Sequence, residues 1–333
     1  MKAQALWFAG PRQAELREEE VPAPTATQVQ VKSLCSLISA GSEMNFYRGE
    51  GNLDDLTMFP TAGGKLPFPL KFGYQEIGEV TAAGEDSGIE VGERLLCFHP
   101  HQSLFTMEAD FGTKIPRGLD PARAAFAGLF GVALNSFLTT PALVGDRVAV
   151  SGLGVVGAFA GYLARLTASK VILIDPLPHR RTKAGWIGAD AVVHPADAAE
   201  AVHDLTGGQG VDLFIEASGA PAALQQAIDL TAVEGTITVP GWYGTRPVPL
   251  KLSPGFHLRR HKIFSTGPSM NPALAPRWDR DRYRDVAWQH VARIDTEANL
   301  ISHKVPFPDA PHAYALLDDP AAEATAVLLW HDE

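Results

Sequence analysis

The pattern of apolar positions changes once along the chain, near Ala124. Before that point the apolar segments are short, and Val29–Lys32 has the period of two that is typical of a half-buried strand. Glycine-containing turns separate these segments. Beyond Ala124, apolar strands alternate with helical segments, which predicts a parallel sheet covered by helices on both faces. The predicted strands of this second part are Arg147–Val150, Val171–Ile174, Ala191–Val193, Leu213–Glu216 and Thr236–Val239.

The two patterns together predict an α/β fold in which a β-rich domain is joined to a doubly wound parallel sheet. A chain of 333 residues is too long for one typical core and suits two domains. We place the first domain at residues 1–128 and the second at residues 129–270. A helix at Tyr283–Ile294 and a strand at Ala326–Leu329 are too little for a third domain, so residues 271–333 are expected to return to the first.

Charge and cysteine content narrow the classes of function. The chain has 28 Lys and Arg against 38 Asp and Glu, and this net charge of −10 argues against a nucleic-acid or anionic-membrane partner. Two cysteines, Cys35 and Cys97, are too few for a disulfide scaffold, so we expect a cytoplasmic protein. The longest apolar stretch, Ala124–Leu134, is shorter than the roughly 20 residues that a membrane span needs. A small molecule is therefore the expected partner.

A glycine-rich turn lies between the strand Arg147–Val150 and the helix that is predicted from Ala158. Its G-x-G-x-x-G pattern is that of a dinucleotide-binding turn, in which the second glycine admits the pyrophosphate and the third lets helix and strand pack closely. The N-terminus of the helix offers free N–H groups to the phosphates. The candidate cofactor-binding residues of the turn are Gly152, Leu153, Gly154, Val155, Val156 and Gly157.

An acidic residue, Asp175, ends the next strand and favours NAD as the cofactor. A carboxylate in this position accepts hydrogen bonds from the ribose hydroxyls of NAD and repels the 2′-phosphate of NADP. Arg180 and Arg181 argue the other way, because arginines can hold a phosphate. We give more weight to the carboxylate and expect NAD. The alternative is a tight helix–strand turn in which Asp175 only caps a helix.

Several further motifs make the chain similar to the medium-chain dehydrogenases/reductases over essentially its whole length. The resemblance implies a GroES-like catalytic domain and a Rossmann domain, and we expect a homodimer. Ile38–Glu43 and Phe98–Gln102 resemble a subgroup that includes bacteriochlorophyllide-type dehydrogenases. The motifs that carry the family resemblance are Ala5–Trp7 through Val21–Pro22, Phe72–Gly78, Val91–Arg94, Val144–Val148 and Gly188–Asp190.

The resemblance also implies further cofactor contacts after the later strands of the Rossmann domain. The carboxyl ends of parallel strands line the ligand crevice in this architecture. Besides Arg180, the expected contacts are Ser218, Gly219, Gly241, Trp242 and Gly267.

The chain departs from the zinc-dependent members of this family at each position that binds the catalytic metal. Those members have a Cys, a Gly-His-Glu motif and a second Cys or acid. Here the motif is Gly73-Tyr74-Gln75, the first Cys position falls on Ser39 or Ala40, and the last falls near Leu129. Catalytic zinc takes His, Cys or carboxylate ligands, so we expect no metal.

Without zinc, side chains must polarise the substrate oxygen and move a proton. Ser42 aligns with the hydroxyl residue of alcohol dehydrogenases, and it is either a proton relay or a turn residue. Tyr74 is either a phenol donor or an aromatic that fills the space of the metal. Gln75 either orients substrate hydroxyls or bonds the backbone.

Two histidines, His99 and His101, follow the predicted strand Arg94–Phe98. A histidine titrates near neutral pH and is a candidate acid, base or polarising group, although a lone histidine is more often structural. Both alternatives stay open for each of them.

The sequence thus predicts an NAD(H)-dependent, zinc-independent alcohol dehydrogenase or ketone reductase. Hydride would move between nicotinamide and a secondary alcohol carbon of a polyol, sugar or natural product. The alternatives are a zinc-free quinone or enoyl reductase that uses NADPH, and a non-catalytic dinucleotide sensor.

Overall fold

Two compact units make up the chain in the computed structural model, which describes all residues except 53–58, 267–273, 275 and 332–333. One unit contains Met1–Gly128 and Trp288–Glu333, and the other contains Leu129–Ala287. The predicted Gly267 contact lies outside the described residues. Together the units give the α/β fold class that the sequence predicted.

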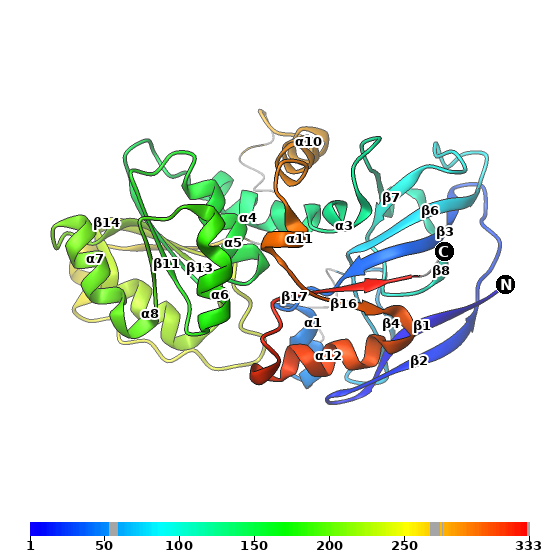
Figure 1. Ribbon diagram of the computed structural model, residues 1–333, viewed down its shortest axis with the longest axis horizontal. Helices are drawn as coiled ribbons and strands as arrows, with labels where there is room; N and C mark the ends of the chain where they lie inside the picture. The colour runs from blue at the N-terminus through cyan, green and yellow to red at the C-terminus, as the bar shows by residue number, and fades with distance from the viewer. Residues whose placement is uncertain (53–58, 267–273, 275, 332–333) are drawn as a thin grey trace. The chain divides into compact units, whose positions relative to one another are not determined.

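The second unit is built on a six-stranded sheet in which every recorded pairing is parallel, in the order β12-β11-β10-β13-β14-β15 (Figure 1). The strand order reverses at β10, because β11 pairs with one edge of it and β13 with the other. Ligands bind at such a switch point in this architecture. The strands are β10 (Arg147–Ser151), β11 (Lys170–Ile174), β12 (Ala191–Val193), β13 (Val211–Glu216), β14 (Thr231–Val239) and β15 (Lys262–Ser265).

Helices cover both faces of this sheet. On one face, Val202 of α7 and Ile228 of α8 share a buried apolar cluster with Ile172 and Phe214 of the sheet. On the other face, a Cβ at Gly161 of α5 would lie 2.8 Å from Leu173, which points away from Ile172 because strand neighbours alternate. The helices are α5 (Val155–Ala164), α6 (Pro178–Lys183), α7 (Ala198–Thr206), α8 (Pro221–Leu230) and α9 (Gly255–Arg259), with 3-10 turns at Ala184–Ile187 and Pro195–Asp197.

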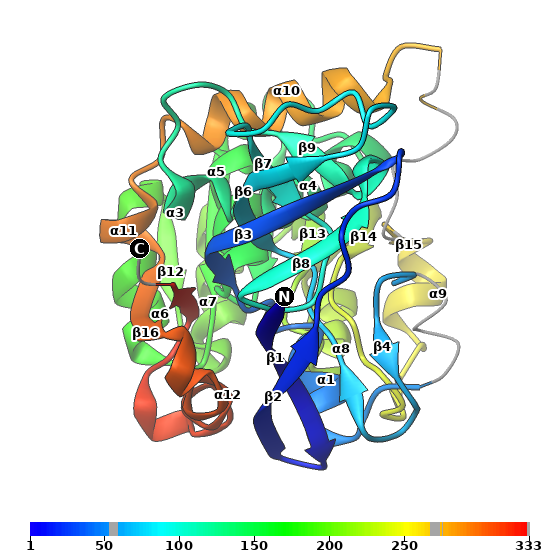
Figure 2. The same ribbon diagram turned by 90° about the vertical axis from the view of Figure 1, so that its right-hand side faces the viewer.

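The first unit contains a four-stranded and a seven-stranded sheet. β3 is the centre of the larger sheet, with antiparallel pairings to β6, β8 and β17 (Figure 2). The strands are β1 (Lys2–Gly10), β2 (Gln13–Glu20), β3 (Gln28–Leu37), β4 (Gly63–Gly64), β5 (Leu70–Lys71), β6 (Glu76–Ala83), β7 (Arg94–Cys97), β8 (Leu104–Glu108), β9 (Gly112–Lys114), β16 (Ile301–Pro306) and β17 (Ala326–Trp330).

Short helices complete the first unit, and two longer helices contain the boundaries between the units. α4 and α10 each contain a unit boundary. The helices are α1 (Glu43–Arg48), α3 (Pro121–Ala124), α4 (Ala127–Thr139), α10 (Arg280–Val291), α11 (Thr296–Asn299) and α12 (Ala310–Asp318), with 3-10 turns at Ala109–Phe111, Phe307–Asp309 and Pro320–Ala322.

The C-terminal return joins the first unit through β17, whose Leu328 pairs with Leu37 of β3. The sequence analysis began this return at residue 271, whereas the first unit resumes at Trp288. The early part of α10 belongs to the second unit, because the phenol of Tyr283 packs on Gly131 of α4, where a Cβ would lie 2.8 Å from the Tyr283 hydroxyl.

One described segment, Pro121–Thr139, is long and apolar enough to cross a membrane by length and composition alone, with a mean hydropathy of 1.3. It is 67% buried inside the protein, as a core helix would be.

The contact between α5 and β10 leads to a stability prediction. A Cβ at Gly157 would lie 1.7 Å from the carbonyl oxygen of Gly152, so Gly157→Ala must displace backbone. Overpacking of this kind costs about 1–3 kcal/mol of unfolding free energy, and urea denaturation measures it. Gly185→Ala is the matched control, because a Cβ at Gly185 meets nothing within 4 Å. Equal stability of the two variants would contradict the prediction.

Candidate active site

The glycine turn has the geometry of a dinucleotide cradle. Gly152 has a φ of 84°, and its N–H donates to the carbonyl of Ile174 at 2.8 Å, which ties the turn to β11. A Cβ at Gly154 would meet nothing within 4 Å, so the space before the first turn of α5 is open. Leu153 and Val155 are buried and Val156 is half-buried, so these residues offer the ligand mainly their backbone N–H groups.

Asp175 lies directly after β11, beside this turn. Its carboxylate accepts hydrogen bonds from the N–H of Leu153 at 2.7 Å and from the N–H of Leu177 at 2.8 Å. Arg180 approaches the same carboxylate at 3.8 Å. Asp175 is only 1% exposed, so in this structure its carboxylate shapes the glycine turn by accepting these backbone N–H groups.

A buried carboxylate that the sequence analysis did not single out, Glu216, organises the ends of β13 and β14. It accepts hydrogen bonds from the N–H and hydroxyl of Ser218, from the N–H of Gly219 and, at 2.6 Å, from the hydroxyl of Tyr243. A Cβ at Gly241 would lie 2.8 Å from it. The sequence feature that could have identified Glu216 is an acidic residue at the end of an otherwise apolar strand.

The predicted contacts after these strands are thus brought together at one sheet edge. The main-chain oxygen of Trp242 lies 2.9 Å from where a Cβ of Gly219 would stand, so the two loops touch. Ser218 is exposed at this edge, which leaves its position open to a ligand.

In the first unit, three hydroxyl groups form a cluster around Tyr74. The phenol oxygen of Tyr74 is 3.0 Å from the Ser42 hydroxyl and donates to the Ser39 hydroxyl. Two of these residues were predicted to act on the substrate or to fill the metal's place, whereas Ser39 was noted only as a lost ligand position. The hydroxyl cluster (Ser39, Ser42 and Tyr74) is the candidate for binding a substrate oxygen.

Aromatic rings surround the Tyr74 ring. The ring centroid of Phe59 lies 5.2 Å from that of Tyr74, that of Phe98 lies 5.7 Å away, and that of Phe72 lies 6.1 Å away. This apolar surrounding disfavours the phenolate, and burial raises the pKa of Tyr74 to about 12 although the two serine hydroxyls oppose the shift. Tyr74 is therefore a neutral hydrogen-bond donor at pH 7.

Gln75 is buried next to the hydroxyl cluster. A Cβ at Gly128 would lie 2.2 Å from its amide nitrogen, so the side chain lies over that glycine. Its side-chain oxygen makes no hydrogen bond within the described part of the chain. This oxygen has almost no exposed surface, so a ligand hydroxyl reaches it only if neighbouring groups move.

The two histidines lie outside the hydroxyl cluster. His99 stacks on Phe105 with ring centroids 3.8 Å apart, and burial lowers its pKa to about 3, so it stays neutral. His101 is fully buried, and its Nε2 lies 2.9 Å from the carboxylate of Glu43. These surroundings favour the structural alternative for both histidines.

The donor set does not fit a catalytic zinc ion. By the resemblance to zinc-dependent members, a phenol stands at the His position and Ser39 or Ala40 at the first Cys position, whereas zinc prefers thiolate, imidazole or carboxylate ligands. Among the described residues, no three His, Cys, Asp or Glu side chains are grouped so as to hold a metal. Cys35 and Cys97 are fully buried, and burial raises the pKa of both thiols well above the ordinary value.

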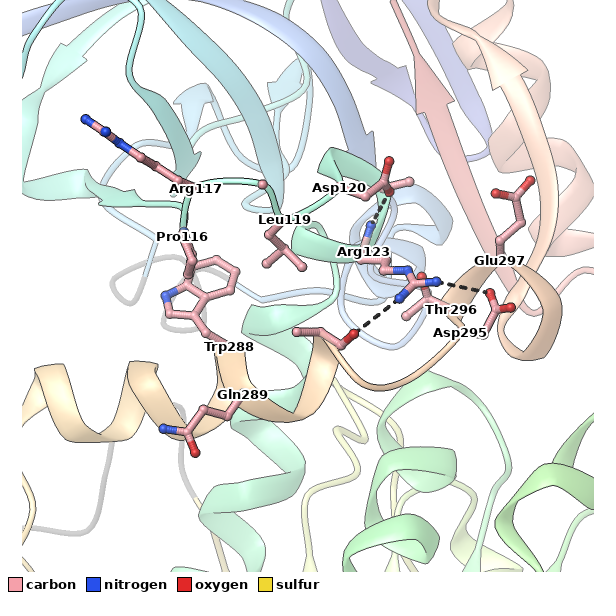
Figure 3. Close-up of a pocket in the computed structure, with 13 residues that line it drawn as sticks. Pro116, Arg117, Leu119, Asp120, Arg123, Trp288, Gln289, Asp295, Thr296 and Glu297 are labelled. Atoms are coloured by element: carbon pink, nitrogen blue, oxygen red, sulfur yellow. Dashed lines mark hydrogen bonds and ion pairs between the residues drawn. The ribbon is translucent and has the colours of Figure 1, made fainter.

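A separate surface hollow of about 710 Å³ lies between the segment Pro116–Arg123 and residues 288–297 (Figure 3). Arg123 donates to the carbonyl of Ala292 at 3.2 Å and lies 3.8 Å from Asp295. None of the lining residues is a predicted site residue, and the cation is already paired with protein groups. We assign the chemistry to the hydroxyl cluster and not to this hollow.

Comparison with known proteins identifies relatives of the chain. The zinc-binding dehydrogenase family profile matches residues 155–279. D-guloside 3-dehydrogenase of Escherichia coli K12 is 29% identical over 338 residues, which cover 93% of this chain and 94% of that protein. L-threonine 3-dehydrogenase of Pyrococcus horikoshii is 30% identical over 264 residues, which cover 69% of this chain and 73% of that protein.

Solved structures share the fold. The structure of 2R,3R-butanediol dehydrogenase of Bacillus subtilis superposes with a TM-score of 0.81 at 19% identity, and the match covers 99% of this chain and 100% of that chain. A putative zinc-binding dehydrogenase of Sinorhizobium meliloti bound to NADP and an alcohol dehydrogenase of Escherichia coli CFT073 complexed with NADH each have a TM-score of 0.79 at 22% identity, covering 99% of both chains. The chain therefore belongs to the zinc-binding dehydrogenases of the medium-chain dehydrogenase/reductase superfamily, and it is an oxidoreductase that acts on alcohols.

Proposed function

We propose that this chain is an NAD(H)-dependent alcohol dehydrogenase or ketone reductase that works without zinc. The observation that carries the proposal is the hydroxyl cluster, in which Tyr74 occupies the place of a zinc-binding histidine and bonds Ser39 and Ser42. Bound NAD would accept the hydride from a secondary alcohol carbon, and NADH would return it to a ketone.

The hydroxyl cluster supplies the polar part of the reaction. In the direction of reduction, the neutral Tyr74 phenol donates a hydrogen bond to the carbonyl oxygen and then gives up its proton as that oxygen becomes a hydroxyl. Ser39 and Ser42 donate to the phenolate that is left, and so lower the cost of its charge. Oxidation runs these steps in reverse and requires that the phenol first lose its proton to solvent, which the raised pKa of Tyr74 makes more favourable at high pH.

The substrate class that we propose is a polyol or sugar with a secondary hydroxyl. Support comes from the relatives, whose names are those of dehydrogenases of a guloside, of threonine and of a butanediol.

We expect Tyr74→Phe to lower kcat by about 10²-fold, because the acid–base group is lost while the ring remains. The assay follows NADH absorbance at 340 nm with a panel of sugars, polyols and ketones. Tyr47→Phe is the matched control, because Tyr47 is a buried tyrosine whose hydroxyl donates to the carbonyl of Arg12, outside the cluster. Wild-type kcat in Tyr74→Phe, or activity that requires stoichiometric zinc, would overturn the mechanism. Binding of NADH without turnover of any substrate would favour a dinucleotide sensor.

The preference for NAD is proposed from Asp175. We expect the wild-type enzyme to prefer NADH, and Asp175→Asn to raise the NADPH/NADH ratio of kcat/KM by about tenfold, which corresponds to removing about 1.4 kcal/mol of charge repulsion. Asp204→Asn is the control, because Asp204 is an exposed acid of α7 that pairs only with His203 among the described residues. A wild-type preference for NADPH would refute the assignment and favour a quinone or enoyl reductase.

We further propose a homodimer formed through β15. This strand is the edge of its sheet, and its Ile263 and Phe264 are 38% and 39% exposed. An exposed apolar edge strand pairs readily with a second copy. We expect Phe264→Glu to convert a dimer into a monomer in light scattering after size-exclusion chromatography, whereas Leu258→Glu on the exposed surface of α9 leaves the mass unchanged. A monomeric wild-type protein would contradict the proposal.

A further inference from the structure

A buried carboxylate, Glu43, contacts the turn that carries two residues of the hydroxyl cluster. Its Oε1 accepts the N–H of Ser39 at 2.8 Å, and the N–H of Glu43 donates to the carbonyl of Ser39 at 2.9 Å. The N–H of Ser42 also donates to that carbonyl at 3.1 Å. The turn that carries both serine hydroxyls is thus closed by the side chain and the backbone of Glu43.

Glu43 is in turn held by His101 and Tyr314. Its Oε2 lies 2.9 Å from Nε2 of His101 and accepts the Tyr314 hydroxyl. The other ring nitrogen of His101, Nδ1, lies 2.8 Å from the hydroxyl of Ser36 on β3. Glu43, His101 and Tyr314 are fully buried, so water does not replace these contacts.

The same imidazole packs against the backbone that carries Tyr74. A Cβ at Gly73 would lie 2.8 Å from Cδ2 and 2.9 Å from Nε2 of His101, and Gly73 has a φ of 143°, which favours glycine. His101 therefore touches the support of the two serines on one side and the support of the tyrosine on the other.

We propose that His101 is the positioning residue of the hydroxyl cluster: by binding Glu43 and packing on Gly73, it sets the spacing between the Ser39–Ser42 turn and Tyr74. The inference rests on the proposed function of that cluster. It replaces the acid–base role that the sequence suggested for His101 with an indirect one.

The charges around His101 keep its ring protonated. Burial lowers its pKa, but the carboxylates of Glu43 on α1 and of Glu76 on β6 outweigh this effect and raise the pKa to about 10. Glu76 lies 3.7 Å from Nδ1 of His101. The Nε2 atom of His331, which follows β17, lies 3.8 Å from the carboxylate of Glu76. Burial lowers the pKa of His331 to about 3, so His331 is neutral and does not compete with His101 for this carboxylate. Ser36 and Tyr314 face the ring as neutral groups.

The charge state is tested first, without any activity measurement. Long-range ¹H–¹⁵N spectra of the histidine rings should show one doubly protonated ring at pH 8, and His101→Gln should remove that signal. Glu43→Gln, which retains the volume of the side chain, should let the ring lose its proton below pH 8. A neutral His101 at pH 8 in the wild-type protein would overturn the charge pairing on which the inference depends.

Positioning is tested by fluorine spectra of protein labelled with 3-fluorotyrosine, with the Tyr74 signal assigned from Tyr74→Phe. We expect His101→Gln and Glu43→Gln to shift or broaden the Tyr74 signal and to leave that of Tyr162, in the other unit, in place. His261→Gln is the matched control, because His261 is a buried histidine of the second unit. An unmoved Tyr74 signal in both variants would overturn the proposal even if the enzyme proves inactive.

Kinetics separate positioning from substrate binding. We expect His101→Gln to lower kcat by up to about 10²-fold, as a misplacement of about 1 Å does, with the Kd of NADH unchanged because no residue of the glycine turn is altered. His261→Gln should retain wild-type kcat. If His101→Gln does not fold, Glu43→Gln gives the same comparison. Wild-type kcat in a folded Glu43→Gln or His101→Gln protein would contradict the inference.

Discussion

The Rossmann unit depends on a single close approach, that of the Gly152 carbonyl to helix α5 at Gly157. Because no side chain separates them, the helix N-terminus comes directly behind the end of β10, at the point where the strand order reverses. Asp175 and Glu216 then fix the neighbouring strand ends by accepting backbone N–H groups. The geometry of the cofactor edge therefore comes from backbone packing, and the two acids hold it in place.

In the other unit, the turn that carries Ser39 and Ser42 depends on one buried acid, Glu43. Buried charges need partners, and the carboxylate of Glu43 has three: the Ser39 N–H, His101 and Tyr314. These partners come from the segment after β3, the segment after β7, and α12, so the turn is tied to distant parts of the unit. The position of this turn is therefore fixed by a polar network.

The sequence was sufficient for the features that depend on periodicity and local spacing. Alternating apolar strands and helices predicted the parallel sheet, and the glycine turn predicted the helix–strand contact at Gly157. Features that depend on tertiary burial were not accessible in this way. His99 and His101 look alike in the segment after β7, yet one stacks on Phe105 and the other pairs with Glu43. The sequence does not distinguish Glu216 from any other residue at the end of a strand, because its role depends on the hydrogen bonds that it accepts from Ser218 and Gly219.

The buried carboxyl group of Glu76 affects how the stability of the fold depends on pH. Burial raises its pKa from an ordinary 4.5 to about 7, although His101 opposes the shift, so folding draws a proton onto it between these values. His99 and His331, with pKa values lowered to about 3 from 6.5, expel protons on folding over an overlapping range. The opposed titrations partly cancel near pH 5.5. Mild acid therefore weakens the fold less steeply than its two buried neutral imidazoles alone would require.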